Sequence, residues 1–210
     1  MNPLRCGHPG QPTLVVVAHP DDETIWCGGL ILRRPDWDWT ILSLCRADDD
    51  DRRPKFRHAC DFLGARAIIS DLDDSSPPAP IDPADDIGRR LRRLACDRPW
   101  GLVLTHGANG EYGHPRHRQT HAEILRLAGT GDLRSDHLWT FAYDCSAATG
   151  RCVPRGDATI RINLTDDQLA GKRRIIHDLY GYEADAFETR ACIRPEAFHR
   201  RRTRLQGGLP

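Results

Sequence analysis

The sequence of 210 residues predicts a single α/β domain with a Rossmann-like, mostly parallel sheet and helices on both faces. Three observations lead to this prediction. Short apolar runs alternate with segments of helical periodicity. The first run, Leu14 to Val17, holds only branched apolar residues, as in a strand that is buried on both faces. Polar clusters follow the first and fourth runs, which in a parallel sheet end at the same edge.

The first half of the chain divides into two helices and two further strands. A helix is predicted with Pro20 in its first turn and Asp21 to Glu23 at its N-terminus, and its C-terminal end is marked by Arg33, Arg34 and Pro35. Gly28 and Gly29 permit its close packing on the sheet. Residues 39–44 form an apolar strand. A helical stripe at Phe56, Cys60 and Leu63 ends at Gly64, and residues 67–70 form a short strand.

The second half begins with a polar, proline-rich loop at 71–83. Asp82 and Pro83 are suited to the cap and first turn of a helix. The remaining predicted elements are strands at 100–105, 138–143 and 158–163, a glycine-rich turn at 107–113, and helices at 115–128, closed by Gly129, and at 165–180. We expect residues 1–12 to form an N-terminal arm, 13–190 the domain, and 191–210 a mobile C-terminal tail.

Composition limits the possible partners. Thirty basic residues balance thirty acidic ones, which argues against nucleic acid or an anionic membrane as partner. No apolar stretch approaches the ~20 residues of a membrane span, and no secretory signal pattern is found at the N-terminus. We therefore expect a cytoplasmic protein without a membrane span. The sequence carries no signal for its oligomeric state.

The eight cysteines are scattered and form no CxxC pair, which favours buried, reduced thiols. Cys145 and Cys152 flank a turn and are able to pair. Because no signal peptide is found, free thiols are the preferred interpretation for these two as well.

Two clusters carry groups that bind metals or transfer protons. The first, residues 19–23, reads His-Pro-Asp-Asp-Glu. The second, residues 110–121, contains His114, His117 and His121. Acidic residues at a helix start often serve only as caps. The second cluster weakens that interpretation, because two histidines and one carboxylate with open positions match a catalytic zinc site.

These motifs, together with His-Pro-Arg-His at 114–117, resemble the PIG-L/LmbE-like family of zinc-dependent N-acetylglucosamine deacetylases. The resemblance implies one Zn²⁺ per chain, or another divalent metal, held by His19, Asp22 and His117. It further implies that Asp21 is the catalytic base and that His114 stabilises the oxyanion and assists the leaving amine. The expected substrate is a small amino-sugar conjugate, converted to acetate and a free amine.

Arg116 departs from the family pattern, which usually has an acid between the two histidines. A guanidinium cannot accept a hydrogen bond, so Glu111 or Asp144 would have to replace that acid, or Arg116 binds an anionic part of the substrate. Two alternatives stay open: a zinc- and sugar-binding protein without turnover, and a zinc hydrolase of a non-sugar amide. We expect His121 and Glu23 to act outside the metal ligand set.

Overall fold

The computed structural model describes residues 8–75, 79–146 and 149–201. Its strands are β1 (Pro12–Val17), β2 (Asp38–Cys45), β3 (Arg66–Leu72), β4 (Trp100–Thr105), β5 (Ser135–Phe141), β6 (Tyr143–Ser146), β7 (Arg151–Pro154), β8 (Ile160–Ile162) and β9 (Glu196–Arg201). Its helices are α1 (Asp22–Arg33), α2 (Arg52–Phe62), α3 (Pro83–Ala95), α4 (Gly110–Gly113), α5 (Pro115–Thr130), α6 (Asp166–Arg174) and α7 (Phe187–Ala191), with a π-helical turn η2 (Ile175–Leu179).

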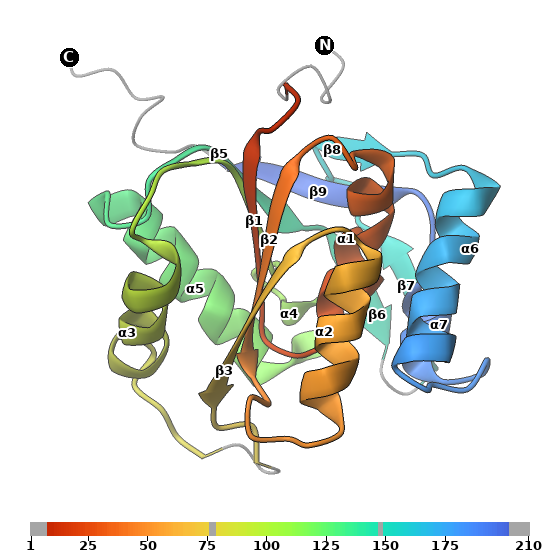
Figure 1. Cartoon of the computed structure of the whole chain (residues 1–210), viewed down its shortest axis with the longest axis horizontal. Coiled ribbons are helices and arrows are strands. Elements are labelled where there is room, and N and C mark those ends of the chain that lie inside the picture. The colour runs from red at the N-terminus through yellow and green to blue at the C-terminus, as the bar shows by residue number, and fades with distance from the viewer. Residues whose placement is uncertain (1–7, 76–78, 147–148, 202–210) are drawn as a thin grey trace.

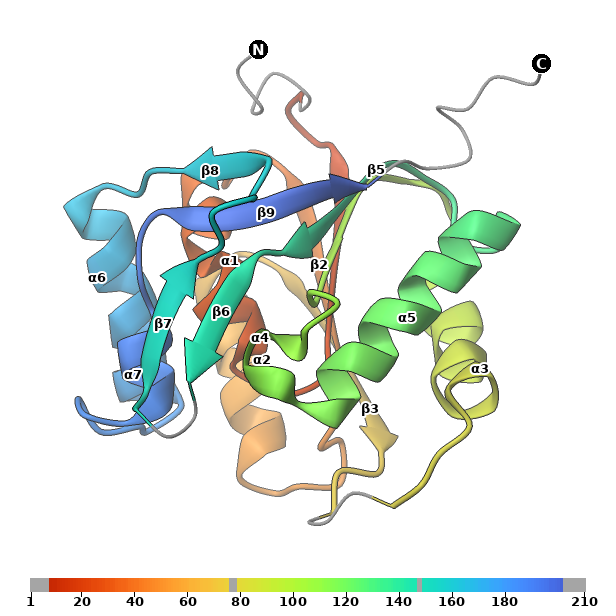
Figure 2. The same cartoon turned by 180° about the vertical axis from the view of Figure 1, so that it is seen from behind.

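One sheet with the order β3-β2-β1-β4-β5-β9-β8 forms the centre of the molecule. The strands from β3 to β5 are parallel, and β9 is antiparallel to both of its neighbours. Helices α3 and α5 cover one face, and α1, α2 and α6 cover the other (Figures 1 and 2). The predicted fold class, a mostly parallel α/β sheet with helices on both faces, is confirmed.

Alternate residues of β1 contribute to two separate cores. Val15 and Val17 pack in the core that contains Trp26 of α1, whereas Leu14 and Val16 pack in the core that contains Leu127 of α5. All four β1 residues are fully buried. This explains why the run contains no polar side chain, since neighbouring residues of a strand point to opposite faces.

Most predicted helices and strands agree with the structure to within a few residues. Asp82 caps α3 by accepting a hydrogen bond from the Ala84 N–H. The predicted end of α5 at Gly129 is wrong, because the helix continues to Thr130 and ends at Gly131, whose φ of 87° satisfies the left-handed cap. The helix predicted from 165 to 180 is divided between α6 and η2.

The predicted C-terminal tail is wrong for residues 191–201. Strand β9 lies inside the sheet between β5 and β8, and its Phe198 is fully buried. The arginines of this segment suggested a solvated tail, but Arg200 is exposed while apolar residues earlier in the strand face the core. Arg202 and Arg204 lie outside the described residues. The predicted arm at 1–12 extends one residue too far, since Pro12 begins β1, and its residues 1–7 lie outside the described residues.

The preference for free thiols at Cys145 and Cys152 is also wrong, because the two form a disulfide. They lie directly opposite each other in the antiparallel β6–β7 hairpin. Cross-strand neighbours of this kind have close Cβ atoms, a relation that sequence spacing alone does not reveal. Cys27, Cys45, Cys60 and Cys192 are free and buried, as expected. Within the described part of the chain, no helix has both the length and the apolar character needed to cross a bilayer.

Gly29 lets α1 approach the last strand of the chain closely. A Cβ at Gly29 would lie 2.3 Å from a Leu164 methyl group and 3.0 Å from the Glu196 carboxylate. That carboxylate is fully buried, accepts the Gly29 N–H and pairs with Lys172. We expect Gly29→Ala to lower the free energy of unfolding by about 1–3 kcal/mol through overpacking.

Gly28→Ala is the matched control for this prediction. A Cβ at Gly28 meets its neighbours at 3.4 Å or more, which is ordinary contact. Alanine is also favoured over glycine within a helix by about 1 kcal/mol. Denaturant midpoints should therefore fall for Gly29→Ala and rise or stay unchanged for Gly28→Ala, and equal midpoints for the two variants would contradict the packing argument.

Candidate active site

The two polar clusters meet at the topological switch point of the sheet. Strand β1 continues through α1 toward β2 on one side, while β4 lies on the other side of β1. His19 follows β1, and the segment that contains His117 follows β4. In an open α/β sheet, the crevice at this point is where ligands bind. The sequence prediction that the clusters lie together agrees with the structure.

A cleft of about 250 Å³ opens at this edge of the sheet. Its lining includes His19, Asp21, Asp22 and His114, four of the five predicted site residues. The fifth, His117, is fully buried beneath them. The rest of the lining is formed by Pro20, Ile25, Trp26, Arg46, Arg52, Asp74, Tyr112, Tyr182, Phe187 and Glu188.

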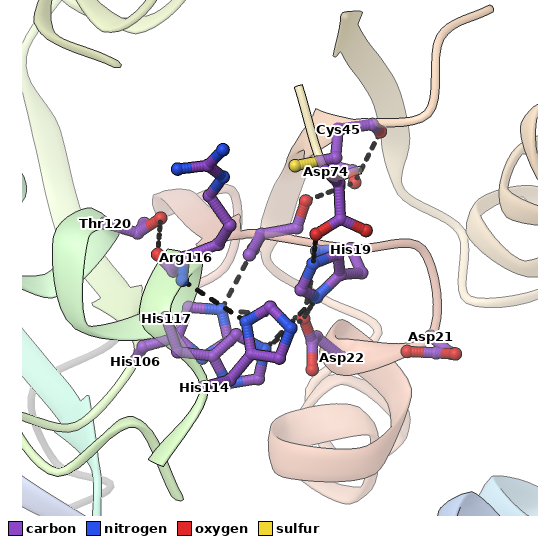
Figure 3. Close-up of polar contacts among 12 residues, drawn as sticks. His19, Asp21, Asp22, Cys45, Asp74, His106, His114, Arg116, His117 and Thr120 are labelled. Carbon is purple, nitrogen blue, oxygen red and sulfur yellow. Dashed lines mark hydrogen bonds and ion pairs between the residues drawn. The ribbon is translucent and has the colours of Figure 1, made fainter. Parts of the chain in front are cut away.

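Three donor atoms form a nearly equilateral triangle at the base of the cleft (Figure 3). His19 Nδ1 lies 3.2 Å from Asp22 Oδ2 and 3.2 Å from His117 Nε2, and the last two atoms are 3.3 Å apart. Ligands about 2.0–2.1 Å from a tetrahedral Zn²⁺ are separated by roughly 3.3 Å. Two imidazole nitrogens and one carboxylate oxygen also suit zinc chemically. The residues present therefore fit the metal that the sequence implied.

The titration behaviour of the triangle reflects its close packing. Burial disfavours a charged imidazole, yet the carboxylates of Asp22 and Glu111 raise the pKa of His117 to about 10. Burial likewise opposes charge on Asp22, but His117 and His106 lower the pKa of its carboxyl well below the usual range. An anionic Asp22 carboxylate in contact with His117 supplies one charged oxygen and one ring nitrogen, and a cation would have to displace the proton that His117 holds.

Asp21 lies apart from Asp22, and both side chains line the cleft (Figure 3). It precedes α1 with φ 106°, and its N–H donates to Glu23 Oε2 at 3.0 Å. Its Oδ2 accepts hydrogen bonds from the Tyr182 hydroxyl and from Arg52. Burial and the neighbouring Asp22 raise the pKa of Asp21 well above its usual value. Glu23 thus holds the backbone that presents Asp21.

His114 caps α5 with its side chain. The Arg116 N–H donates to His114 Nδ1 at 3.2 Å, so the neutral imidazole carries its hydrogen on Nε2. Burial and the nearby His19 and His117 lower the pKa of His114 to about 4. The ring stands edge-on to His19 with centroids 4.6 Å apart. A neutral donor in the cleft suits the stabilisation of developing negative charge.

Arg116 does not face the cleft. Its side chain is 1% exposed, and its guanidinium donates to the Asp73 carbonyl, the Asp73 carboxylate and the Ala79 carbonyl, and to Gln119 Oε1. The alternative that Arg116 binds an anionic part of the substrate is therefore wrong. Its role is to anchor the loop after β3, which also carries Asp74.

We expect Arg116→Asp to lower the free energy of unfolding by about 2–4 kcal/mol, because it removes these bonds and buries a carboxylate beside Asp73. Arg118→Asp is the neighbouring control, since Arg118 is exposed and donates only to the Asn109 carbonyl among the contacts described. Denaturation of both variants measures the difference. If Arg116→Asp instead raised the turnover and left the stability unchanged, Arg116 would merely occupy the position of the acid that the family usually has there.

The two acids proposed to compensate for Arg116 lie in different places. Asp144 is exposed and bonds to Asn109 and Arg155, away from the cleft. Glu111 is buried and accepts from His117 Nδ1 at 2.7 Å, so it contacts a triangle residue and not His114. His121 donates from Nδ1 to the His106 carbonyl and lies outside the triangle.

Sequence reasoning missed three contributors. His106 stacks on His117 with ring centroids 3.8 Å apart. Asp74 Oδ1 lies 3.0 Å from His19 Nε2, and Tyr182 bonds to Asp21. His106 follows an apolar strand directly, which was a usable signal. Asp74 and Tyr182 lie in segments without a distinctive pattern.

Comparison with known proteins shows which family the chain belongs to. A family model described as PIG-L, GlcNAc-PI de-N-acetylase, matches residues 14–128. The chain belongs to the PIG-L family. Among curated PIG-L relatives, a 1D-myo-inositol 2-acetamido-2-deoxy-alpha-D-glucopyranoside deacetylase of Corynebacterium glutamicum is 26% identical, and the match covers 57% of this chain and 53% of that protein. The chain thus spans little more than half the length of that relative.

Solved structures place this PIG-L chain in a fold with several activities. The antimicrobial-reagent pseudoaglycone deacetylase Dbv21 superposes with a TM-score of 0.62 at 15% identity, covering 84% of each chain. GalB, a 4-carboxy-2-hydroxymuconate hydratase from Pseudomonas putida, superposes with a TM-score of 0.61 at 16% identity, covering 95% of this chain and 100% of GalB. At these identities only the fold is shared, so the reaction must be argued from the site.

Proposed function

We propose that the protein is a metal-dependent hydrolase that removes the N-acetyl, or another N-acyl, group from an N-acetylglucosaminyl conjugate. The observation that carries the proposal is the triangle of His19 Nδ1, Asp22 Oδ2 and His117 Nε2 at the base of the cleft. Membership of the PIG-L family and the deacetylase activity named for the curated relative support it.

His19, Asp22 and His117 would hold one Zn²⁺, which when bound supplies Lewis-acid activation of water and of the amide carbonyl. Asp21 is the proposed base, because it lines the same cleft without belonging to the triangle. It would take a proton from the attacking water and return it to the amine when the C–N bond breaks. His114 would donate from Nε2 to the oxygen that develops negative charge.

The size of the cleft favours a substrate that places a single sugar ring at the reaction centre. Its volume of about 250 Å³ is small for a ligand site. Arg46 and Asp74 pair with each other at 2.8 Å and line its wall, where they offer a donor and an acceptor to hydroxyl groups. Tyr112 and Phe187 form an aromatic contact, with centroids 5.1 Å apart, on another part of the lining.

Acetate release across a panel tests the proposal. The panel would contain inositol-linked N-acetylglucosamine, N-acetylglucosamine oligosaccharides, an N-acylated glycopeptide and a non-sugar acetamide, with metal content measured on the same sample. We expect release from at least one amino-sugar conjugate and about one zinc per chain. Release from the non-sugar amide alone would favour the general amide hydrolase, and zinc and sugar binding without any release would favour the binding protein.

A further inference from the structure

The carboxylate of Glu111 forms hydrogen bonds with three buried groups of the protein and does not line the cleft. Gly107 N–H donates to Oε1 at 2.6 Å, while His106 Nδ1 and His117 Nδ1 lie 2.9 and 2.7 Å from Oε2. Glu111 is 2% exposed and is absent from the cleft lining. No step of the proposed reaction uses it.

Its backbone is held in an unfavourable conformation. Glu111 has φ 56° and ψ −59°, one of three non-glycine residues with positive φ in the described chain. Such a conformation costs on the order of 1–3 kcal/mol and persists only where surrounding contacts enforce it. The strained turn directs the Glu111 side chain inward, where it contacts Gly107, His106 and His117.

The hydrogen bonds determine the tautomers of both histidines. The Ala18 N–H donates to His106 Nε2 at 2.9 Å, so that nitrogen is an acceptor and the hydrogen of a neutral His106 is on Nδ1. His106 Nδ1–H therefore donates to Glu111 Oε2. An oxygen that already accepts from His106 can also accept from His117, which places a hydrogen on His117 Nδ1. When His117 is neutral, its Nε2 lone pair is then directed into the triangle.

The same bonds connect the two loops of the site. Ala18 immediately precedes His19 at the end of β1, whereas His106 immediately follows β4. The path from Ala18 through His106 to Glu111 and His117 thus holds both ligand-bearing loops at fixed separation. His106 adds its stacked ring to the back of His117.

We propose that Glu111 is a positioning residue of the metal centre, which fixes the His117 tautomer and, through His106, the separation of the two ligand loops. The inference rests on the proposed function, because it presumes that His117 Nε2 binds metal. Loss of a ligand's hydrogen-bond partner typically weakens metal binding by about 10–100-fold.

Glu111→Gln in the full-length chain is the principal test. If the glutamine carbonyl faces the histidines, its NH₂ group faces the Gly107 N–H, and two donors then oppose each other. If the NH₂ group faces the histidines instead, His117 Nδ1 must accept, and the hydrogen of a neutral His117 moves to Nε2. We expect Zn²⁺ affinity, measured by competition with a chelator, to fall by about 10–100-fold. Glu123→Gln is the matched control, a buried carboxylate of α5 whose partner Arg126 is exposed and which lies outside the site, and it should retain wild-type affinity.

Imidazole NMR of the wild-type protein provides a test that does not depend on folding of the variant. Long-range ¹H–¹⁵N spectra of the zinc-loaded protein should show His106 and His117 both protonated at Nδ1. A hydrogen on Nε2 of His106, or wild-type zinc affinity in Glu111→Gln, would overturn this inference alone. A wild-type protein that binds no zinc would overturn the proposed function as well.

Discussion

Alanine at His117 is expected to abolish stoichiometric zinc binding and, with it, hydrolysis. The side chain contributes one of three donor atoms, and its neighbours His19 Nδ1 and Asp22 Oδ2 are 3.2 and 3.3 Å from it. Loss of a ligand's hydrogen-bond partner weakens metal binding by about 10–100-fold, and loss of the ligand itself should weaken it more. Metal analysis after gel filtration, with chelator competition, measures the loss. His19→Ala and Asp22→Ala should behave in the same way.

His121→Ala is the control for this experiment. His121 lies on the same helix, α5, but donates to the His106 carbonyl and lies outside the triangle, so the variant should retain zinc. Full zinc occupancy in His117→Ala would refute the ligand assignment.

Zinc binding by the wild type should also weaken as pH falls. With its pKa raised to about 10, His117 is protonated at neutral pH in the metal-free protein, so zinc must displace that proton. Each displaced proton lowers the apparent affinity by about tenfold per pH unit below the pKa. An affinity independent of pH between 6 and 8 would exclude this competition.

Asparagine at Asp21 is expected to retain the metal and lower kcat by about 10²–10⁴-fold, the usual contribution of a general base. The substitution preserves shape, but an amide cannot accept the proton of water. Asp21 is outside the triangle, and its carboxylate is held by Tyr182 and Arg52, so the metal ligands should be undisturbed.

Two measurements separate a catalytic effect from a structural one. Zinc content and denaturant midpoint of Asp21→Asn should remain close to those of the wild type, while turnover falls. Asp144→Asn changes an exposed acid of the same chemical type outside the cleft and should have wild-type turnover. Near-native turnover in Asp21→Asn would place the base elsewhere, with Glu23 the next acid to examine.

The parallel half of the fold was predictable from local patterns. The run Leu14 to Val17 identifies a strand buried on both faces, and Asp82 with Pro83 identifies a helix start. These features act over a few residues, because side-chain periodicity and capping depend on near neighbours. Each is therefore visible in the sequence without knowledge of the tertiary structure.

The last strand could not be predicted in this way. Strand β9 has only six residues, ends in arginines, and is stabilised by pairing with β5 and β8. Its buried Glu196 would be unfavourable in an apolar core without Lys172 and the N–H groups of α1. Those partners are distant in sequence, so the local pattern suggested a solvated tail.

At the site, the alternation of strands and helices was sufficient to predict that the two motifs meet, since parallel strands end at one edge of the sheet. The family resemblance, and not the local pattern, selected His19, Asp22 and His117 within those motifs. Only the tertiary structure decided the roles of the residues around them. Arg116 is a loop anchor because Asp73 and Ala79 surround its guanidinium, and Glu111 contacts two histidines because a strained turn directs it inward. The function of a polar side chain depends on which partners replace its water, and those partners come from distant parts of the chain.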